Sequence, residues 1–521
     1  MARRTTVTAV PEASAKTKGK TLDRLKELLE ERQGKPPVDD FGSFERELRG
    51  RMAEIERDLL AEELQRFDID APVVLIDGVP HRRVLRCEET YMSAAGPVRV
   101  ERTLYSTRRD GERAVSALEL RAGIVEKHWT PLAAEQAVFM VSLMTPQETE
   151  TLCAKLGQMQ PSKSSLDRLP KQLSREWEAK REAFEPQLRA DDLVPAEAAT
   201  VAVSLDGVLV PMRDGEREEK RARATAEGRP ASGPAGYQEV GCGTVSFYDA
   251  TGERLSTVKF GRMPEFKKST LKKILAEELG AALAQRPDLT LVTVADGAND
   301  NWDFLHGALP PSTEVIDFYH AADHLNVALS AAYGEGTVKC RAQFDKLRRV
   351  LLEDPDGVEK IIRSLLHLTK QHPGSGRLAN ELAYFRKHRH RMHYATWRAA
   401  CLPIGSGVVE AACKTLATQR MKRSGMRWRH EGGQAILTFR SLVQSDRFDR
   451  AWALLAATYR ADVTLMENVV ALSDFRRRFG CQYESYTHAL SVPVHRASPS
   501  TLLSVDFAPT KPLRGVRKLA A

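Results

Sequence analysis

The sequence has few cysteines and no long apolar run. Its 7 cysteines are scattered and odd in number, and no two of them form a C-x-x-C pair, so neither a disulfide framework nor a cysteine-based zinc site is expected. No apolar stretch approaches the roughly 20 residues that span a bilayer, and the first residues lack the apolar core of a secretion signal. These absences predict a cytoplasmic protein with no membrane partner.

The chain is long and rich in charge of both signs. At 521 residues it exceeds one compact core, and its 42% apolar residues are enough to bury several domains. Lys and Arg total 78 against 70 Asp and Glu, which leaves a net charge of +8. A positive balance suits a polyanionic partner, although many proteins carry such a charge on ordinary surfaces.

The first part of the chain divides into three segments. Residues 1–40 are polar and basic, which predicts a disordered arm that touches nucleic acid. Residues 41–125 show an amphipathic helical repeat and then an alternating, Arg-rich stretch, which predicts a helix and a β-ribbon that contacts DNA or is an ordinary solvated hairpin. Residues 126–195 hold short helical patterns typical of a helix-turn-helix, although any small helical bundle has the same pattern.

The centre of the chain changes to apolar strands. In residues 196–320, three β-rich runs are followed by a helix, a strand, a short helix and another strand. Residues 321–402 are wholly helical, residues 403–449 continue as a basic helix, and residues 450–521 hold further helices and a Pro-rich tail. The order β-β-β-α-β-α-β-α predicts an α/β RNase H-like core with an all-helical insertion, preceded by an N-terminal helical and β-ribbon DNA-binding region.

Two aspartates interrupt apolar strands, and Gly follows each of them. Asp206 lies in SLDGV and Asp296 in VADGA, and a buried carboxylate is unfavourable unless a cation or a donor offsets it. If the two strands are parallel neighbours, both carboxyl groups meet at one edge of the sheet. Such a pair can share a proton, act as acid and base, or hold a divalent cation. A turn role for Asp206, and Asp300 or Asp303 as the ligand instead of Asp296, are the alternatives.

A third acid lies in the segment LPIGSGVVEAACKTLATQRMKRSGMRW, residues 402–428. Taken alone, Glu410 fits the first turn of a helix, where it favours the helix dipole and can pair with Lys414. If the segment returns to the sheet edge, Glu410 completes three carboxylates, and this set favours Mg²⁺ or Mn²⁺ over zinc. Two such ions roughly 4 Å apart can activate a water or a 3′-hydroxyl and stabilise the leaving oxygen of a phosphodiester.

The basic residues after Glu410 are predicted to contact nucleic acid. A solvated basic face is the usual alternative, but this run lacks acids and contains an aromatic ring that can stack on a base or a ribose. The candidates are Lys414, Arg420, Lys422, Arg423, Arg427, Trp428 and Arg429.

The chain resembles the transposases of bacterial insertion sequences of the ISKra group, which are distantly similar to Mutator-like enzymes. The resemblance covers about residues 201–446, is most specific in residues 402–428, and rests on the motifs SLDGV, ADGA, DFYHAADHL and LPIGSGVVEAACKTLATQRMKRSGMRW. It implies a DDE triad of Asp206, Asp296 and Glu410. The [CD]-x-x-H element of the Mutator-like relatives corresponds to Asp317 and His320, which are secondary candidates.

The resemblance also implies an activity. A DDE transposase binds the terminal inverted repeats of its element and cleaves and joins DNA strands with Mg²⁺ or Mn²⁺, working as a homo-oligomer that synapses two DNA ends. Such a bacterial protein would be cytoplasmic and associated with the nucleoid when bound to DNA. The alternatives are a catalytically inactive or domesticated DNA-binding protein and an RNase H-like structure-specific nuclease.

Overall fold

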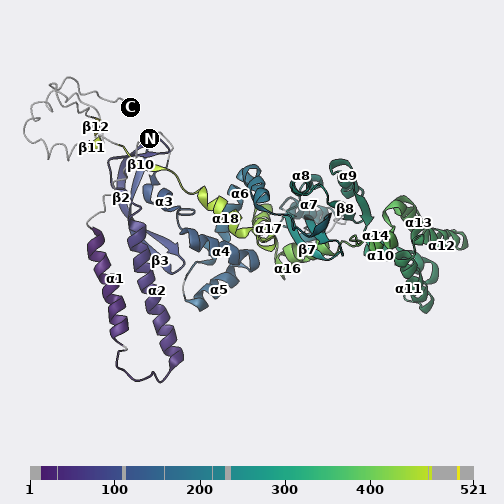
Figure 1. Ribbon diagram of the computed structural model, residues 1–521, viewed down its shortest axis with the longest axis horizontal. Helices are drawn as coiled ribbons and strands as arrows, with labels where there is room; N and C mark the ends of the chain where they lie inside the picture. Colours follow the sequence, from purple (N-terminus) through teal and green to yellow (C-terminus); the bar gives the residue numbers. More distant parts are fainter. Residues whose placement is uncertain are drawn as a thin grey trace, which may run out of the picture. The chain divides into compact units, whose positions relative to one another are not determined.

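The computed structural model describes residues 13–31, 33–107, 113–157, 159–213, 215–228, 236–466, 469–471 and 502–504 (Figure 1). The chain forms two compact units: the first comprises Met1–Ala137, Pro146–Leu166 and Ala453–Ala521, and the second Val138–Thr145 and Asp167–Trp452. The boundaries pass through the range 126–195, so this range, which we predicted as one helical region, is not a separate unit.

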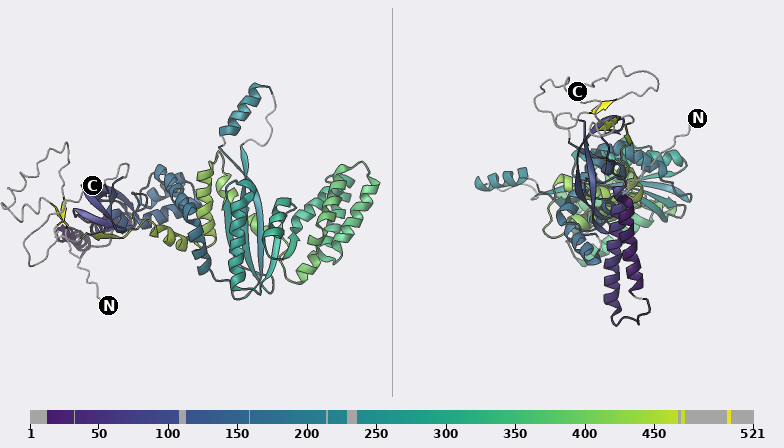
Figure 2. Two further views of the ribbon diagram at one scale, coloured as in Figure 1. Left: turned by 90° about the horizontal axis from the view of Figure 1, so that it is seen from above. Right: turned by 90° about the vertical axis from the view of Figure 1, so that its left-hand side faces the viewer.

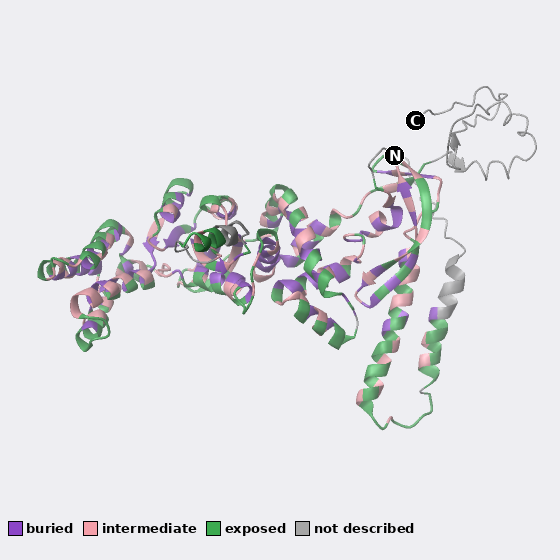
Figure 3. Cartoon of the chain, turned by 180° about the vertical axis from the view of Figure 1, so that it is seen from behind, coloured by how far each residue is buried: buried purple, intermediate pink, exposed green. Residues whose placement is uncertain are grey.

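An antiparallel pair of helices begins the first unit, α1 (Ala13–Glu30) and α2 (Phe41–Gln65). Figure 3 shows that α2 and the second half of α1 are largely exposed. Helix α1 corrects our prediction of a disordered arm over 1–40, because the leucines of its second half recur at helical spacing and the helix packs against α2. Thr21 Oγ1 donates to Glu62 Oε1 at 2.8 Å across the pair. The part of the arm before Ala13 lies outside the described residues.

A five-stranded antiparallel sheet completes the first unit in the order β10-β1-β2-β3-β4. Its long ribbon, β2–β3, alternates buried and exposed side chains, so Tyr91, Val98 and Val100 share a core with Leu64 of α2. The strands are β1 (Val73–Ile76), β2 (Val79–Ser93), β3 (Gly96–Ser106), β4 (Val115–Ser116) and β10 (Val463–Leu465). The short strands β11 (Val469–Ala471) and β12 (Leu502–Ser504) pair separately.

Helices α4, α6 and α18 pass from one unit into the other. Helix α6 is longer than the short helical patterns predicted within residues 126–195, because it continues through Pro186 to Asp191. Ion pairs hold its second half, including Glu178 with Arg262 at 2.6 Å. The helices of this region are α3 (Ala117–Ala122), α4 (Pro131–Leu143), α5 (Pro146–Leu156), α6 (Lys163–Asp191) and α18 (Phe448–Ala457).

The second unit is built on a five-stranded mixed sheet in the order β7-β6-β5-β8-β9. Strands β5, β6 and β7 are antiparallel neighbours, whereas β8 and β9 run parallel to β5. The strands are β5 (Ala198–Pro211), β6 (Tyr237–Asp249), β7 (Arg254–Arg262), β8 (Thr290–Ala295) and β9 (Thr313–Ile316). Helix α7 (Gly215–Ala226), between β5 and β6, projects from the sheet (Figure 2).

Both faces of this sheet are covered by helices. Helix α8 (Ser269–Gln285) approaches so closely that a Cβ at Gly243 would lie 2.7 Å from Leu275. On the other face, a Cβ at Gly261 would lie 3.1 Å from Leu437 of α17 (His430–Gln444). Because side chains alternate along a strand, Asp206, whose register partner is Cys242, points to the α17 face. The short helix α9 (Asn299–Ala308) joins β8 to β9.

A group of helices lies between β9 and the segment that carries Glu410. It shares one core with the sheet, since Phe318, Leu325, Leu382 and Phe385 belong to the same buried cluster as Val203 and Val294. The helices are α10 (Phe318–Tyr333), α11 (Val338–Glu353), α12 (Gly357–Gln371), α13 (Gly376–His388) and α14 (Tyr394–Ala399), with a short 3₁₀ turn at Arg389–Arg391. Another 3₁₀ turn, Phe266–Lys268, precedes α8. Among the described residues, no helix is both long and apolar enough to cross a bilayer.

Candidate active site

Three aspartates stand side by side at one edge of the second unit's sheet. Asp206 lies within β5, Asp296 directly follows β8, and Asp317 directly follows β9. The register pairs Ser204 with Val294 and, on the next strand, Ala295 with Ile316. Continued along the strands, this register sets the three aspartates next to one another, with neighbouring strands about 4.8 Å apart. We call Asp206, Asp296 and Asp317 the acid row.

Asp206 is a half-buried carboxyl group with a raised pKa. Burial is the main cause, and the negative charge of Asp296 raises the pKa further, whereas a hydrogen bond from Gly207 N–H to Oδ1 at 2.7 Å opposes both. The two carboxylates therefore disfavour each other's charge, as expected when they stand on adjacent strands. A cation held by both would relieve this repulsion.

Asp296 is held by the turn that follows its strand. Its Oδ1 accepts from the backbone N–H of Ala298 at 3.1 Å and from Asn301 Nδ2 at 3.2 Å, and its carbonyl accepts from Trp302 Nε1 at 2.5 Å. The competing acids point elsewhere. Asp300 pairs with Lys272 Nζ at 2.6 Å, and Asp303 is exposed on α9.

Asp317 is fully buried and caps helix α10. One carboxylate oxygen accepts from His320 N–H at 2.7 Å, and the other accepts from the backbone N–H of Ser406. The backbone of the two segments is also joined, since Phe318 N–H donates to Ile404 C=O at 3.0 Å. These bonds are the reason that the segment before Glu410 returns to the sheet edge.

Glu410 lies in the first turn of α15 (Gly407–Ala412) and comes next to Asp317 rather than into a tight cluster with the two predicted aspartates. Ser406 Oγ donates to Glu410 Oε1 at 2.6 Å. Within the part of the chain that the structure describes, the one group of three potential metal ligands is Asp317, His320 and Glu410, whose ligand atoms all lie within 4.8 Å of one another. That spacing fits a single cation with bonds of about 2.0–2.2 Å after small side-chain shifts.

The helix that carries Glu410 also reaches Asp206. After α15 the chain forms a π-helical turn (Cys413–Thr418), and Cys413 Sγ lies 3.6 Å from Asp206 Oδ2. A contact with Cys242 and burial raise the pKa of the Cys413 thiol, so it stays protonated and donates to the carboxylate. Residues three apart on a helix share a face, with about 5–6 Å between their Cβ atoms. Glu410, near Asp317, therefore lies about one helical turn from Cys413, which contacts Asp206, so the helix crosses the acid row.

Some residues near the acid row gave no signal in the sequence. Lys268 lies close enough for its charge to oppose the raised pKa of Asp206, and it also pairs with Glu239 Oε1 at 2.8 Å. It follows Lys267, and both have positive φ, 50° and 53°. Such backbone is strained for side chains other than Gly and is found at functional sites. Tyr384 of α13 lies against Gly297, directly after Asp296.

The predicted nucleic-acid contacts divide into exposed and internal residues. Arg420 is 2% exposed and its guanidinium donates to the carbonyl of Val141 at 3.4 Å, while Trp428 Nε1 donates to Met421 C=O at 2.9 Å. Arg420 also lies over the Trp428 ring, 5.4 Å from its centroid, so this pair holds the turn together. The remaining candidates are exposed: Lys414, Lys422, Arg423, Arg427 and Arg429.

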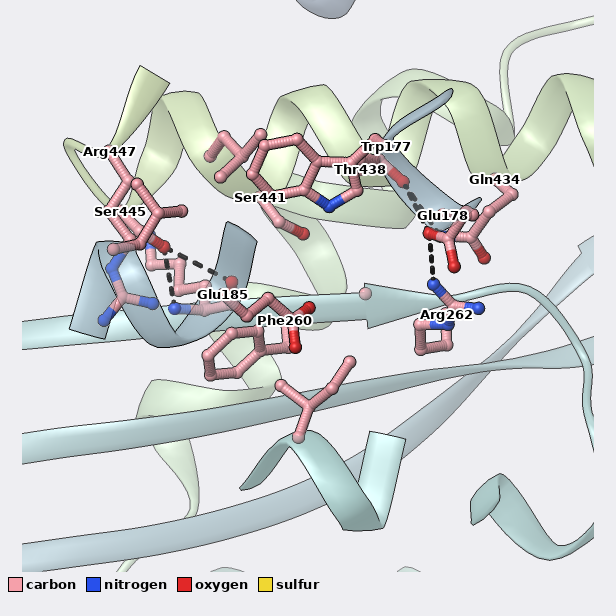
Figure 4. A pocket seen from close by; sticks show the side chains of 15 residues that line it. Trp177, Glu178, Glu185, Phe260, Arg262, Gln434, Thr438, Ser441, Ser445 and Arg447 are labelled. Carbon is pink, nitrogen blue, oxygen red and sulfur yellow. Dashed lines mark hydrogen bonds and ion pairs between the residues drawn. The ribbon is translucent and has the colours of Figure 1, made fainter. Parts of the chain in front are cut away.

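A separate cavity of about 50 Å³ lies under helices α6 and α17, against β7 (Figure 4). Glu178 accepts there from Arg262 at 2.6 Å and from Thr438 at 3.5 Å. Glu185 lines the same cavity, and burial raises its pKa to about 7 despite the nearby charges of Arg181 and Arg189. None of the acid row lines this cavity, which is too small for anything beyond a few waters.

Comparison with known proteins gives little further information. No protein-family model matches the sequence, and no curated protein has significant sequence similarity to it. Among the solved structures that match is the Drosophila P element transposase strand transfer complex, at 12% sequence identity and a TM-score of 0.24, over 63% of this chain and 83% of that chain. An overlap of this quality does not establish a shared fold, so the function has to be argued from the acid row and Glu410.

Proposed function

We propose that the chain is a DDE transposase of the ISKra type, with an RNase H-like catalytic core. The observation that carries the proposal is the convergence of the acid row with Glu410 from a distant helix. The mixed sheet of the second unit, in the order β7-β6-β5-β8-β9 with β8 and β9 parallel to β5, supports this proposal. Four carboxylates in and beside one sheet edge repel one another, and a divalent cation is the natural partner for such a set.

The residues present fit a divalent cation. Asp206 and Asp296 would hold one together, and Asp317, His320 and Glu410, whose ligand atoms lie within 4.8 Å of one another, would hold one after small side-chain shifts. Because imidazole joins this second set, Mn²⁺ suits it better than Mg²⁺. Once bound, the cation would supply an activated water or 3′-hydroxyl and stabilisation of the leaving oxygen. The protein's own part is to fix the carboxylates, through Ser406, Asn301 and the Cys413 thiol.

The DNA partner is part of the same proposal. The exposed basic residues that follow Glu410 in the chain, among them Lys422 and Arg427, would bind the phosphates of a strand that reaches the acid row. The β2–β3 ribbon and the helices of residues 126–195 would bind the terminal inverted repeats. We further propose that the protein acts on two element ends as a homo-oligomer, at the bacterial nucleoid.

The first test replaces one carboxylate of the acid row. In Asp296→Asn the side chain keeps its shape but loses its charge, so strand cleavage of candidate element ends in Mn²⁺ or Mg²⁺ should fall by at least about 100-fold. Binding of the same ends, measured by fluorescence anisotropy, should persist. Asp303→Asn is the matched control, because it removes the same charge from exposed α9 and should cleave normally.

The same assay separates the alternative functions. Cleavage that Asp296→Asn leaves unchanged would rule out the proposed site. End binding without any cleavage by the wild type would favour an inactive or domesticated DNA-binding protein. Cleavage without joining of the 3′ end to a target duplex would favour a structure-specific nuclease.

A further inference from the structure

Tyr384 is fixed beside the acid row by groups from two helices. Its ring stacks on the imidazole of His324 in α10, with ring centroids 3.7 Å apart and planes 19° from parallel. His324 is held in turn, because its Nδ1 lies 2.6 Å from Glu381 Oε2 on α13. The Tyr384 ring is therefore fixed in orientation, and its hydroxyl has a defined place.

The hydroxyl lies near the two carboxylates of the acid row that directly follow strands β8 and β9, those of Asp296 and Asp317. A Cβ at Gly297 would lie 2.6 Å from Cε2 of Tyr384 and 3.4 Å from its hydroxyl oxygen, so the ring needs a glycine directly after Asp296. Burial raises the pKa of the Tyr384 hydroxyl, and the charges of Asp296 and Asp317 raise it further. The hydroxyl is thus protonated at neutral pH, and it is available as a hydrogen-bond donor.

The Tyr384 hydroxyl is buried, yet it has no hydrogen-bond partner among the residues that the structure describes. Buried hydroxyls in native proteins almost always have a partner, because an unmade bond leaves the lost hydration uncompensated. Tyr394, in the same core, shows the usual arrangement: its hydroxyl donates to Ile316 C=O at 2.9 Å. The Tyr384 hydroxyl instead lies beside Gly297, the residue directly after Asp296, and near enough to Asp296 and Asp317 for their charges to raise its pKa.

We propose that Tyr384 is a further ligand-contacting residue of this site, whose hydroxyl donates to an oxygen atom that the acid row holds through its cation. The inference rests on the proposed function. A cation cannot accept a hydrogen bond, but a water bound to it or a phosphate oxygen of the DNA can. Either oxygen would complete the pairing of the hydroxyl only when the site is filled.

The first experiment uses the full chain without divalent ions and compares Tyr384→Phe with Tyr394→Phe. Removal of a hydroxyl that has no protein partner should leave the thermal unfolding midpoint unchanged or raise it. Tyr394→Phe makes the same chemical change in a fully buried side chain but loses a formed bond, so its midpoint should fall by about 2–4 °C. If Tyr384→Phe falls as far as Tyr394→Phe, the hydroxyl has a partner within the protein and the proposal is overturned.

The second experiment adds Mn²⁺ alone and then Mn²⁺ with candidate-end DNA. If the partner is a cation-bound water, Tyr384→Phe should weaken the Mn²⁺-dependent rise of the midpoint by about tenfold in apparent Kd. If it is a phosphate oxygen, the Mn²⁺ response stays normal and DNA affinity falls by a similar factor. Wild-type responses to both would overturn the proposal.

The proposed function can be tested separately from the role of Tyr384. If Glu410→Gln kept a normal Mn²⁺ response and normal cleavage, the proposed metal site would be contradicted, whatever the result for Tyr384→Phe. A wild-type protein without any response to Mn²⁺ or DNA would overturn both the metal site and the role of Tyr384. If the wild type responds to Mn²⁺ and DNA, and Glu410→Gln loses this response while Tyr384→Phe keeps it, the proposed function stands. Only the inference about Tyr384 is then overturned.

Discussion

At the scale of single residues, Glu185 shows how folding changes the chemistry of one group. Its carboxyl lies in the wall of the cavity under α6, next to Trp177 and Phe260 (Figure 4). Burial raises its pKa from 4.5 to about 7. The folded state therefore binds more protons at this group than the unfolded state between these two values, so stability falls as the pH rises through that window.

This linkage predicts the effect of Glu185→Gln. The amide has no proton to lose, so the variant should lack the fall in stability that Glu185 causes. Between pH 5 and pH 8 the wild type should lose roughly 2 kcal/mol more than the variant, as measured by urea unfolding at a series of pH values. Glu182→Gln, on the same helix but exposed and paired with Lys273, is the control and should keep the wild-type dependence. Parallel pH profiles for wild type and Glu185→Gln would contradict the assigned pKa.

Some residues of the candidate site could be predicted from the sequence, and others could not. Asp206 and Asp296 stand out because a charged residue inside an apolar strand is costly, and that cost is visible in the residue pattern. Tyr384 and Lys268 look like ordinary members of a helix and a helix start. Their role depends on which segments folding brings together, and no local pattern carries that information.

At the scale of elements, the π-helical turn Cys413–Thr418 sets the orientation of the helix that crosses the acid row. A π-turn leaves carbonyl groups that need partners outside the helix. Arg440 of α17 supplies one of them, with Nε donating to Thr415 C=O at 2.6 Å, and its Nη1 also donates to Ser142 C=O at 2.9 Å. Gln444 Nε2 donates to the same Thr415 carbonyl at 3.1 Å.

Arg440→Met should therefore weaken both stability and the site. The change removes the Arg440 donor from Ser142 C=O and one of the two side-chain donors from Thr415 C=O, which keeps Gln444, and should cost about 2–4 kcal/mol of unfolding free energy. The turn would also lose a hydrogen bond that orients Glu410 and Cys413. The rise of the unfolding midpoint with Mn²⁺ should therefore weaken together with stability. Arg423→Met, on an exposed position of the following turn, is the control, with a change within about 0.5 kcal/mol expected. If Arg440→Met proved as stable as the control, the turn would be held by other contacts.

Elements with a strong periodic pattern could be predicted from the sequence, and their extents could not. The strands around Asp206 and Asp296 follow from their apolar runs, and the parallel pairing of β5 with β8 agrees with the handedness rule for a helical crossover. Helix α1 was missed because its support comes from α2, a tertiary contact that overrides a polar composition. Helix α6 is longer than predicted because it continues through Pro186 to Asp191, where ion pairs with other segments hold it.

At the scale of the whole molecule, charge placement matters more than net charge. The excess of +8 is small for 521 residues, but the segment after Glu410 concentrates exposed Lys and Arg without acids. Replacement of Lys422, Arg423 and Arg427 by Gln should weaken DNA binding at all sequences alike. If each contacts one phosphate, the slope of log K against log salt should lose about 2 to 3 units.

The control for this variant removes the same charge elsewhere in the second unit. Arg341, Lys346 and Arg349 are exposed on α11, and their replacement by Gln should leave the salt slope nearly unchanged. Anisotropy titrations across a range of KCl concentrations measure both slopes. Equal slopes for the two triple variants would show that the basic segment acts through overall charge alone.

The backbone bond between Phe318 and Ile404 has a consequence for how the chain tolerates change. This bond joins the start of α10 to the segment that follows α14. The two ends of the helical group α10 to α14 are therefore held together whatever the length of the chain between them. Loops within this helical group, such as the one between α11 and α12, can lengthen or shorten without moving Glu410. Helix α13 is tied to its present position through the ring that lies on Gly297, and α14 through the Tyr394 hydroxyl, which donates to Ile316 C=O.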